Sequence, residues 1–146
     1  MQYSDRELLA RLIQCEAGGE GDIGMKAVAS VIMNRVHYPV GEYARVGMGS
    51  IRKIITQPGQ FACVSDVING RYNPQNIYNM NPTGEHFAIA DWAIAGNRLP
   101  GLGDSLWFYN PFSSNCRQTF PSDVGYYIGK YQQHCFYDPT DLYEFT

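Results

Sequence analysis

Residues 4–36 read SDRELLARLIQCEAGGEGDIGMKAVASVIMNRV, two helical patterns joined by a glycine-rich turn. Ser4, with Glu7 three positions later, forms a capping-box signature that predicts the start of the first helix. Apolar residues then recur at spacings of three and four, which predicts one apolar helix face. This face contains Leu8, Leu9, Leu12 and Ile13.

Glu16 lies where a carboxylate is unusual, four residues after Leu12 and three after Ile13, and therefore on the same face. Gly18 and Gly19 follow at once, where a helix would stop and the backbone could approach a ligand. Removal from water should raise the pKa of such a carboxylate, which is the environment that a general acid needs at neutral pH. A surface glutamate in a fraying last turn is the alternative interpretation.

The second helix is predicted from Asp22, as its N-cap, to about Arg35 or Val36, and its apolar pattern indicates strong burial. Residues 41–49 are predicted to be a loop, because glycines interrupt any periodicity. Ser50 is expected to cap a short helix that Pro58-Gly59 ends.

The second half of the chain has shorter patterns. Residues 69–81 predict a long loop or β-excursion, and residues 83–96 a fourth helix capped by Thr83. Residues 106–109 predict an aromatic strand, residues 123–130 a short helix or turn, and residues 134–137 an extended segment. The fold is therefore expected to be mostly α with a minor β element in the second half.

The composition predicts one globular domain over residues 1–146, since 45% of residues are hydrophobic and 17% charged. The apolar runs are too short to span a membrane, and a net charge of −3 without a basic run argues against nucleic acid as the partner. The charged N-terminal helix is not a classical signal peptide, so export without one, or a mature fragment, is expected. The eleven tyrosines suit a glycan-binding cleft, or simply complete the core.

The four cysteines form no zinc pattern, and we expect neither a metal nor a cofactor. Cys116 and Cys135 bracket a short segment and are expected to form a disulfide in an oxidising compartment. Cys15 and Cys63 are expected to be small buried apolar residues.

Six stretches, taken in order, form a more specific pattern. They are CEAGGEG (15–21), GMKAVA (24–29), VIMNRV (31–36), QPGQF (57–61), LWFYNP (106–111) and GKYQQHCFY (129–137). Together they resemble the SleB/CwlJ family of spore-cortex-lytic cell-wall hydrolases, most closely its short single-domain CwlJ branch. The resemblance runs from Leu8 to about Pro139, but residues 38–50 and 65–84 have no close counterparts.

The resemblance implies a lysozyme-like, lytic-transglycosylase-type α+β catalytic domain that cuts the glycan strands of peptidoglycan, with Glu16 as its catalytic glutamate. It also implies lysis of the spore cortex during germination and a place in the spore coat or cortex, with a possible coat anchoring protein as partner. A phage-borne relative, released by lysis, would share the same pattern.

Glycan cleavage normally uses two carboxylates, and Glu16 is the only clear candidate. Glu20 is expected to orient Glu16 or bind substrate, and Asp104 is the remote carboxylate of most interest. A single glutamate suits a lytic transglycosylase on the bond between N-acetylmuramic acid and N-acetylglucosamine. It would protonate the glycosidic oxygen and then take the proton of the muramic 6-hydroxyl, which closes a 1,6-anhydro ring. A muramidase that uses water is the alternative.

Gln57 and Phe61 are further candidates to hold the sugar, although Pro58-Gly59 could be an ordinary helix stop. Tyr109 is expected to line the cleft from the aromatic strand, on the strand face that it shares with Trp107.

The sequence also allows other interpretations of individual residues and of the function. Arg35 and His134 are expected to be structural. A cysteine hydrolase built on Cys15 or Cys63, and a non-catalytic glycan-binding or spore-coat protein on the same scaffold, are the remaining alternatives.

Overall fold

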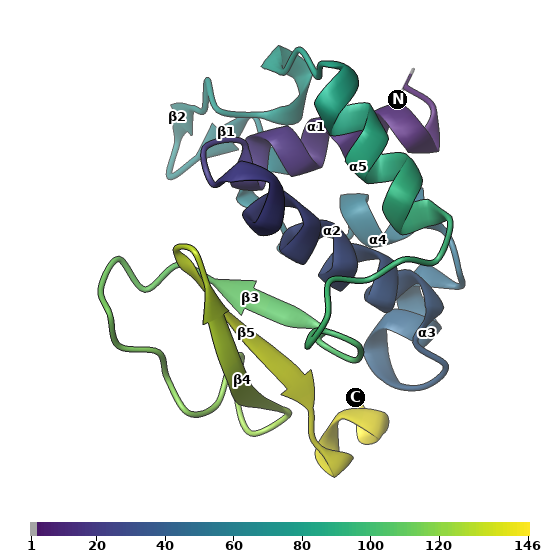
Figure 1. Cartoon of the computed structure of the whole chain (residues 1–146), viewed down its shortest axis with the longest axis vertical. Helices are drawn as coiled ribbons and strands as arrows, with labels where there is room; N and C mark the ends of the chain where they lie inside the picture. The colour runs from purple at the N-terminus through teal and green to yellow at the C-terminus, as the bar shows by residue number, and fades with distance from the viewer. Residues whose placement is uncertain (1–2) are drawn as a thin grey trace.

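A group of helices packs beside a three-stranded sheet in the computed structural model, which describes residues 3–146 (Figure 1). The helices are α1 (Asp5–Ala17), α2 (Gly21–His37), α3 (Gly41–Gly47), α4 (Ile51–Thr56) and α5 (Gly84–Ile94), with 3-10 helices η1 (Ala62–Val64), η2 (Ile77–Asn79) and η3 (Asp141–Phe145). The strands are β1 (Val67–Ile68), β2 (Arg71–Tyr72), β3 (Trp107–Tyr109), β4 (Gly125–Tyr131) and β5 (His134–Pro139). The predicted fold class, mostly α with a minor sheet in the second half, is confirmed.

The sheet has the order β3-β5-β4, and both pairs are antiparallel. β1 and β2 form a separate antiparallel hairpin; β2 lies within residues 69–81, predicted as a loop or β-excursion, and β1 lies just before them. β5 is the central strand, and its first four residues are buried, which joins the sheet to the helical core. No helix within residues 3–146 combines the length and the apolar character needed to cross a membrane.

α2 is the centre of the helical part, and twelve of its seventeen residues are buried. The apolar face of α1 packs against it, and all four residues predicted for that face are fully buried. The Ser4 hydroxyl accepts a hydrogen bond from the backbone N–H of Glu7 (3.1 Å), which fixes the start of α1 as predicted. α1 ends at Ala17, so Glu16 lies in its last turn.

The start of α2 differs slightly from the prediction. The helix begins at Gly21, and Asp22 belongs to its first turn instead of capping it. The Asp22 carboxylate lies 3.0 Å from the Lys26 ammonium one turn later. This leaves only residues 18–20 to connect α1 and α2, so the turn that follows Glu16 is short.

The prediction of a loop at residues 41–49 was wrong, because this stretch contains α3. The C-terminal segment stabilises the first turn of α3, where helix N–H groups otherwise have no partner. The Tyr143 hydroxyl accepts a hydrogen bond from the N–H of Tyr43 (2.9 Å), and the Thr146 hydroxyl accepts one from Glu42 (2.8 Å). A segment about one hundred residues away therefore decides the conformation, and a local pattern could not predict it.

The prediction of a short helix or turn at residues 123–130 was also wrong, because β4 occupies most of it. Its tyrosines suit a strand, and its backbone pairs with β5 from Gly125 to Tyr131. Gly129, with φ 159°, lies next to the irregularity in this pairing, where the register shifts between Tyr127 and Gly129. The backbone hydrogen bonds with β5 therefore decide the conformation of this segment, although its glycines suggest a turn.

Two disulfides join distant parts of the chain. Cys116–Cys135 confirms the predicted pair and ties the β3–β4 connection to β5. Cys15–Cys63 was not predicted, and the expectation that these were separate apolar residues was wrong. It links the last turn of α1 to η1 across 48 residues, a proximity that sequence spacing does not reveal.

Candidate active site

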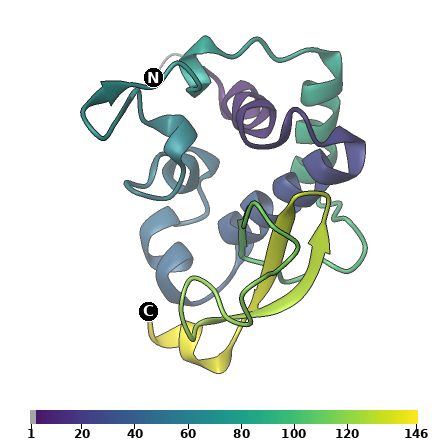
Figure 2. The ribbon, with the colours of Figure 1, turned by 90° about the vertical axis from the view of Figure 1, so that its left-hand side faces the viewer.

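A cleft of about 590 Å³ opens between the helices and the sheet. Its walls come from the end of α1, the α1–α2 turn, residues 60–62, the end of β3 with the residues after it, and the β4–β5 turn. Figure 2 shows this side of the molecule, with the β3–β4 loop in green and the α1–α2 turn in dark purple above it. Segments that are far apart in the sequence therefore line one cavity.

Glu16 lies in the wall of this cleft and is half-buried. Burial raises the pKa of its carboxyl group to about 7; Arg35 acts against this shift and Glu20 adds to it. Among residues 3–146, no group hydrogen-bonds the Glu16 carboxyl group. A carboxyl group with this pKa is available both to give and to accept a proton near neutral pH, as general acid–base catalysis requires.

Arg35 forms part of the same cavity, although the sequence suggested a structural role. Its Nε donates to the carbonyl of Leu106 (2.7 Å), and its guanidinium lies 5.0 Å from the centre of the Phe61 ring. Burial lowers the pKa of Arg35, while the Glu16 carboxylate acts to raise it. A charged residue within a strongly apolar helical pattern was the sequence signal that could have indicated a role in the site. The structure buries nearly every side of this helix.

Glu20 is held at the opposite end of the α1–α2 turn. Its Oε1 accepts a hydrogen bond from the backbone N–H of Gln133 (3.0 Å), and its Oε2 lies 2.7 Å from Nδ1 of His134. The side chains of Glu20 and His134 are each only 9% exposed. Glu20 thus joins the α1–α2 turn to the β4–β5 turn, and His134, expected to be structural, lies in the cleft wall.

The other predicted substrate-binding residues divide between the cleft and its surroundings. Phe61 and Tyr109 line the cleft, but Gln57 does not: its amide donates to the Glu42 carboxylate at 2.7 Å. Gln60 takes the place expected for Gln57, with its carbonyl oxygen 2.9 Å from the Tyr43 hydroxyl. The QPGQF motif thus contributes Gln60 and Phe61 to the cleft wall, and Pro58-Gly59 turns the chain between its two glutamines.

The strand alternation placed Trp107 and Tyr109 on one face and Phe108 on the other. The structure buries Trp107 in the core and lines the cleft with both Phe108 and Tyr109. Phe108 packs edge-on against His134, with 5.1 Å between the ring centres. Phe108 was missed because both faces of this short strand contact protein, so its period does not single out a cleft face.

Two further carboxylates, one of them the remote carboxylate named from the sequence, lie elsewhere. Asp104 borders a separate hollow with Tyr38 and Pro39, and Asp91 forms an ion pair with Arg6. Cys15 and Cys63 are joined to each other, so neither carries the free thiol that a cysteine hydrolase needs. Within the described residues, no three His, Cys, Asp or Glu side chains gather as metal ligands would.

Comparison with known proteins gives consistent matches over most of the chain. The family model described as Cell Wall Hydrolase matches residues 19–137. Cell wall hydrolase CwlJ from Bacillus subtilis (strain 168) is 29% identical over 137 residues, which covers 94% of this chain and 87% of that protein. Cell wall hydrolase CwlJ from Oceanobacillus iheyensis is 30% identical over 135 residues, which covers 92% and 86%.

Two solved structures share the fold. One is the catalytic domain of the germination-specific lytic transglycosylase SleB from Bacillus anthracis, with a TM-score of 0.66 and 25% identity. That match covers 94% of this chain and 98% of the other. The catalytic domain of the Bacillus cereus SleB protein also has a TM-score of 0.66, with 27% identity and coverage of 93% and 92%.

Proposed function

The chain belongs to the Cell Wall Hydrolase family, and from this premise we propose that its cleft cuts the glycan strands of spore-cortex peptidoglycan. The family predicted from the six sequence motifs is thereby confirmed. The observation that carries the proposal is Glu16, a half-buried carboxyl group with a pKa near 7 in the wall of a large cleft. The similarity to the cell wall hydrolase CwlJ supports the cell wall as the substrate, and the similarity to the germination-specific SleB supports a role in germination. The cortex as the part of the wall that is cut follows from the resemblance of the six motifs.

In the proposed reaction, protonated Glu16 gives its proton to the glycosidic oxygen between N-acetylmuramic acid and N-acetylglucosamine. The glycosidic bond breaks as positive charge develops on the muramic C1. The Glu16 carboxylate then accepts the proton of the muramic 6-hydroxyl, whose oxygen bonds to C1. The product is a 1,6-anhydromuramic end, and Glu16 returns to its protonated state without the use of water.

The disposition of the second carboxylate favours this route over hydrolysis. Hydrolytic glycosidases position a second carboxylate to activate water or to attack the sugar. Glu20 is the other carboxylate of the cleft wall; its Oε1 accepts the hydrogen bond from the N–H of Gln133, and its Oε2 lies 2.7 Å from Nδ1 of His134. We therefore assign Glu20 a role in positioning the turn beside Glu16, with Phe61, Tyr109 and Gln60 as sugar-binding candidates.

Digestion of cortex glycan in oxygen-18 water tests the reaction type. Ring closure incorporates no heavy oxygen, so we expect muropeptides that end in unlabelled 1,6-anhydromuramic acid by mass spectrometry. A commercial muramidase, run in parallel, should give one heavy oxygen per cut. Predominantly labelled reducing ends from this protein would show that it is a muramidase and would make Glu20 the next residue to mutate.

The pKa of Glu16 predicts how activity depends on pH. Since the acid form is needed for the first step, activity should fall as the pH rises through about 7. The negative charge of Glu20 raises the pKa of Glu16, so Glu20→Gln should move this alkaline limb to lower pH. Gln keeps an oxygen for the N–H of Gln133, which preserves the local hydrogen bond.

The matched control for this prediction is Glu85→Gln, which removes a carboxylate of α5 that does not line the cleft. Its pH profile should match that of the parent protein. An alkaline limb that stays in place or moves upward in Glu20→Gln would contradict the proposed coupling between the two glutamates.

A further inference from the structure

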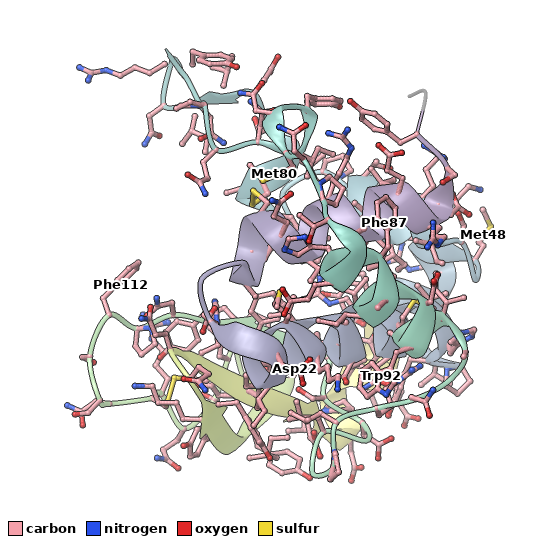
Figure 3. All side chains as sticks on the ribbon, turned by 45° about the horizontal axis from the view of Figure 1, so that its top comes forward. Asp22, Met48, Met80, Phe87, Trp92 and Phe112 are labelled. Carbon is pink, nitrogen blue, oxygen red and sulfur yellow. A yellow bond between two sulfur atoms is a disulfide. The ribbon has the colours of Figure 1, made fainter. Side chains whose placement is uncertain are left out.

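Phe112 is an exposed aromatic residue in the wall of the candidate cleft. Its side chain contributes to the cavity, yet the residue is 90% exposed, the highest value among the large exposed hydrophobic residues. Its backbone has φ 53°, in the left-handed region that bulky residues rarely adopt. Figure 3 shows its ring projecting from the β3–β4 loop, away from the sheet. Both its exposure and its backbone conformation are unfavourable for the isolated protein.

The loop that carries Phe112 is anchored at several points. The Asn110 side chain accepts a hydrogen bond from the backbone N–H of Phe112 (2.7 Å), and Lys130 of β4 donates to the carbonyl of Ser113 (2.9 Å). The Tyr109 hydroxyl accepts one from the N–H of Arg117 (2.9 Å), next to the disulfide of Cys116. The ring is thus presented to solvent by a braced loop and not by a loose one.

The surroundings of Phe112 indicate what its ring would contact. Asn110, Gln133 and Gln75 also line the cleft, and their neutral amides can both donate and accept hydrogen bonds. The Asn110 amide already reaches the Gln133 carbonyl at 3.4 Å, which connects the loop to the β4–β5 turn. An apolar ring beside neutral amides matches a pyranose, which has an apolar C–H face and a rim of hydroxyl and N-acetyl groups.

We infer that Phe112 forms an additional sugar-binding position at the mouth of the cleft, where its ring stacks on a pyranose of the glycan strand. The inference rests on the proposed function and deepens it. Glu16 is half-buried in the cleft wall, whereas Phe112 is almost fully exposed. In this inference the sugar at Phe112 therefore lies further along the strand than the two sugars that flank the cut bond. A longer strand therefore gains affinity from Phe112, and a short one does not.

Phe145 provides a matched control for this position. It is 79% exposed and belongs to η3, and it lines neither this cleft nor the neighbouring hollow beside Glu42. Replacing either phenylalanine with alanine removes a similar exposed ring, but only Phe112→Ala removes one from the cleft. A difference between these variants therefore reports on the position of the ring.

Binding is measured in the Glu16→Gln background by calorimetry, with peptide-free glycan oligomers of two and of eight sugars. Phe112→Ala should weaken binding of the octasaccharide by about tenfold, the scale of one aromatic contact, and leave the disaccharide unaffected. Phe112→Trp should restore the affinity, and its exposed indole should shift its emission to shorter wavelength when the octasaccharide binds. Phe145→Ala should bind as the background protein does.

Octasaccharide binding that is unchanged in Phe112→Ala, with the Glu16→Gln background still binding it, would overturn this inference and leave the proposed function intact. Weakening that is equal for both oligomers would also overturn it, since the ring would then contact the sugars at the cut bond. No binding of either oligomer by the background protein would overturn both the inference and the proposed function. Thermal unfolding of each variant checks that the exposed substitution leaves the fold unchanged.

Discussion

Glu16→Gln should reduce the cleavage of cortex peptidoglycan by at least about a hundredfold, the scale expected for the loss of a general acid. Glutamine keeps the shape and the hydrogen-bonding capacity of the side chain but has no proton to transfer. The loss of turbidity of decoated spores, followed over time at pH 6, measures the effect. Near-normal activity of this variant would contradict the assignment of Glu16.

Although the same substitution should abolish most of the activity, it should not lower the stability of the protein above pH 7. This makes it a test of the burial of Glu16. Burial raises the pKa in the folded protein to about 7, above the ordinary value of 4.5. The protonated group therefore contributes stability that is complete below about pH 4.5 and is lost as the pH rises to about 7. Above pH 7 the parent protein must bury a charge, and Glu16→Gln should then be at least as stable in urea unfolding. If the variant were clearly less stable than the parent protein at pH 8, misfolding would explain its loss of activity.

Removal of the Cys15–Cys63 disulfide is the second change with a large expected effect. The double variant Cys15→Ser/Cys63→Ser should lose about 4 kcal/mol of stability, because the disulfide closes a loop across 48 residues in the unfolded chain. Cys15 precedes Glu16 directly, and Cys63 lies in η1 beside the cleft residues 60–62. We therefore expect activity to fall as well, since the wall that holds Glu16 loses its covalent link.

The second disulfide supplies the control. Cys116→Ser/Cys135→Ser opens a loop across only 19 residues, so it should cost about 3 kcal/mol and less than the first pair. Urea unfolding with circular dichroism, together with intact-mass measurement before and after alkylation, measures both effects. Four alkylated thiols in the air-oxidised parent protein would contradict the presence of either disulfide.

Much of the helical architecture could be predicted from local sequence, because helix starts and buried faces have short-range causes. Ser4 and Ser50 cap their helices through a backbone N–H three residues later, and the apolar face of α1 is buried as its spacing predicts. The position of Glu16 on that face likewise predicted the direction of its pKa shift. The six motifs predicted the family, although no single motif would have been sufficient.

The errors in the secondary structure have long-range causes. α3 depends on hydrogen bonds from Tyr143 and Thr146, and β4 depends on pairing with β5. The local sequence of each segment is rich in glycine and suggests a loop or a turn. In both cases a partner from the C-terminal part of the chain supplies the hydrogen bonds that fix the backbone.

The sequence by itself determined the helical core, the family and the candidate acid Glu16, since each depends on residue types at short, regular spacing. Only the tertiary structure brought Arg35 into the cleft, exchanged Gln57 for Gln60 and joined Cys15 to Cys63. It alone also set Glu20 against His134, 114 positions later, and Phe112 at the mouth of the cleft. The physical reason is that a cleft is formed by contacts between distant segments, and these depend on how the helices and the sheet pack, which the spacing within one segment does not encode.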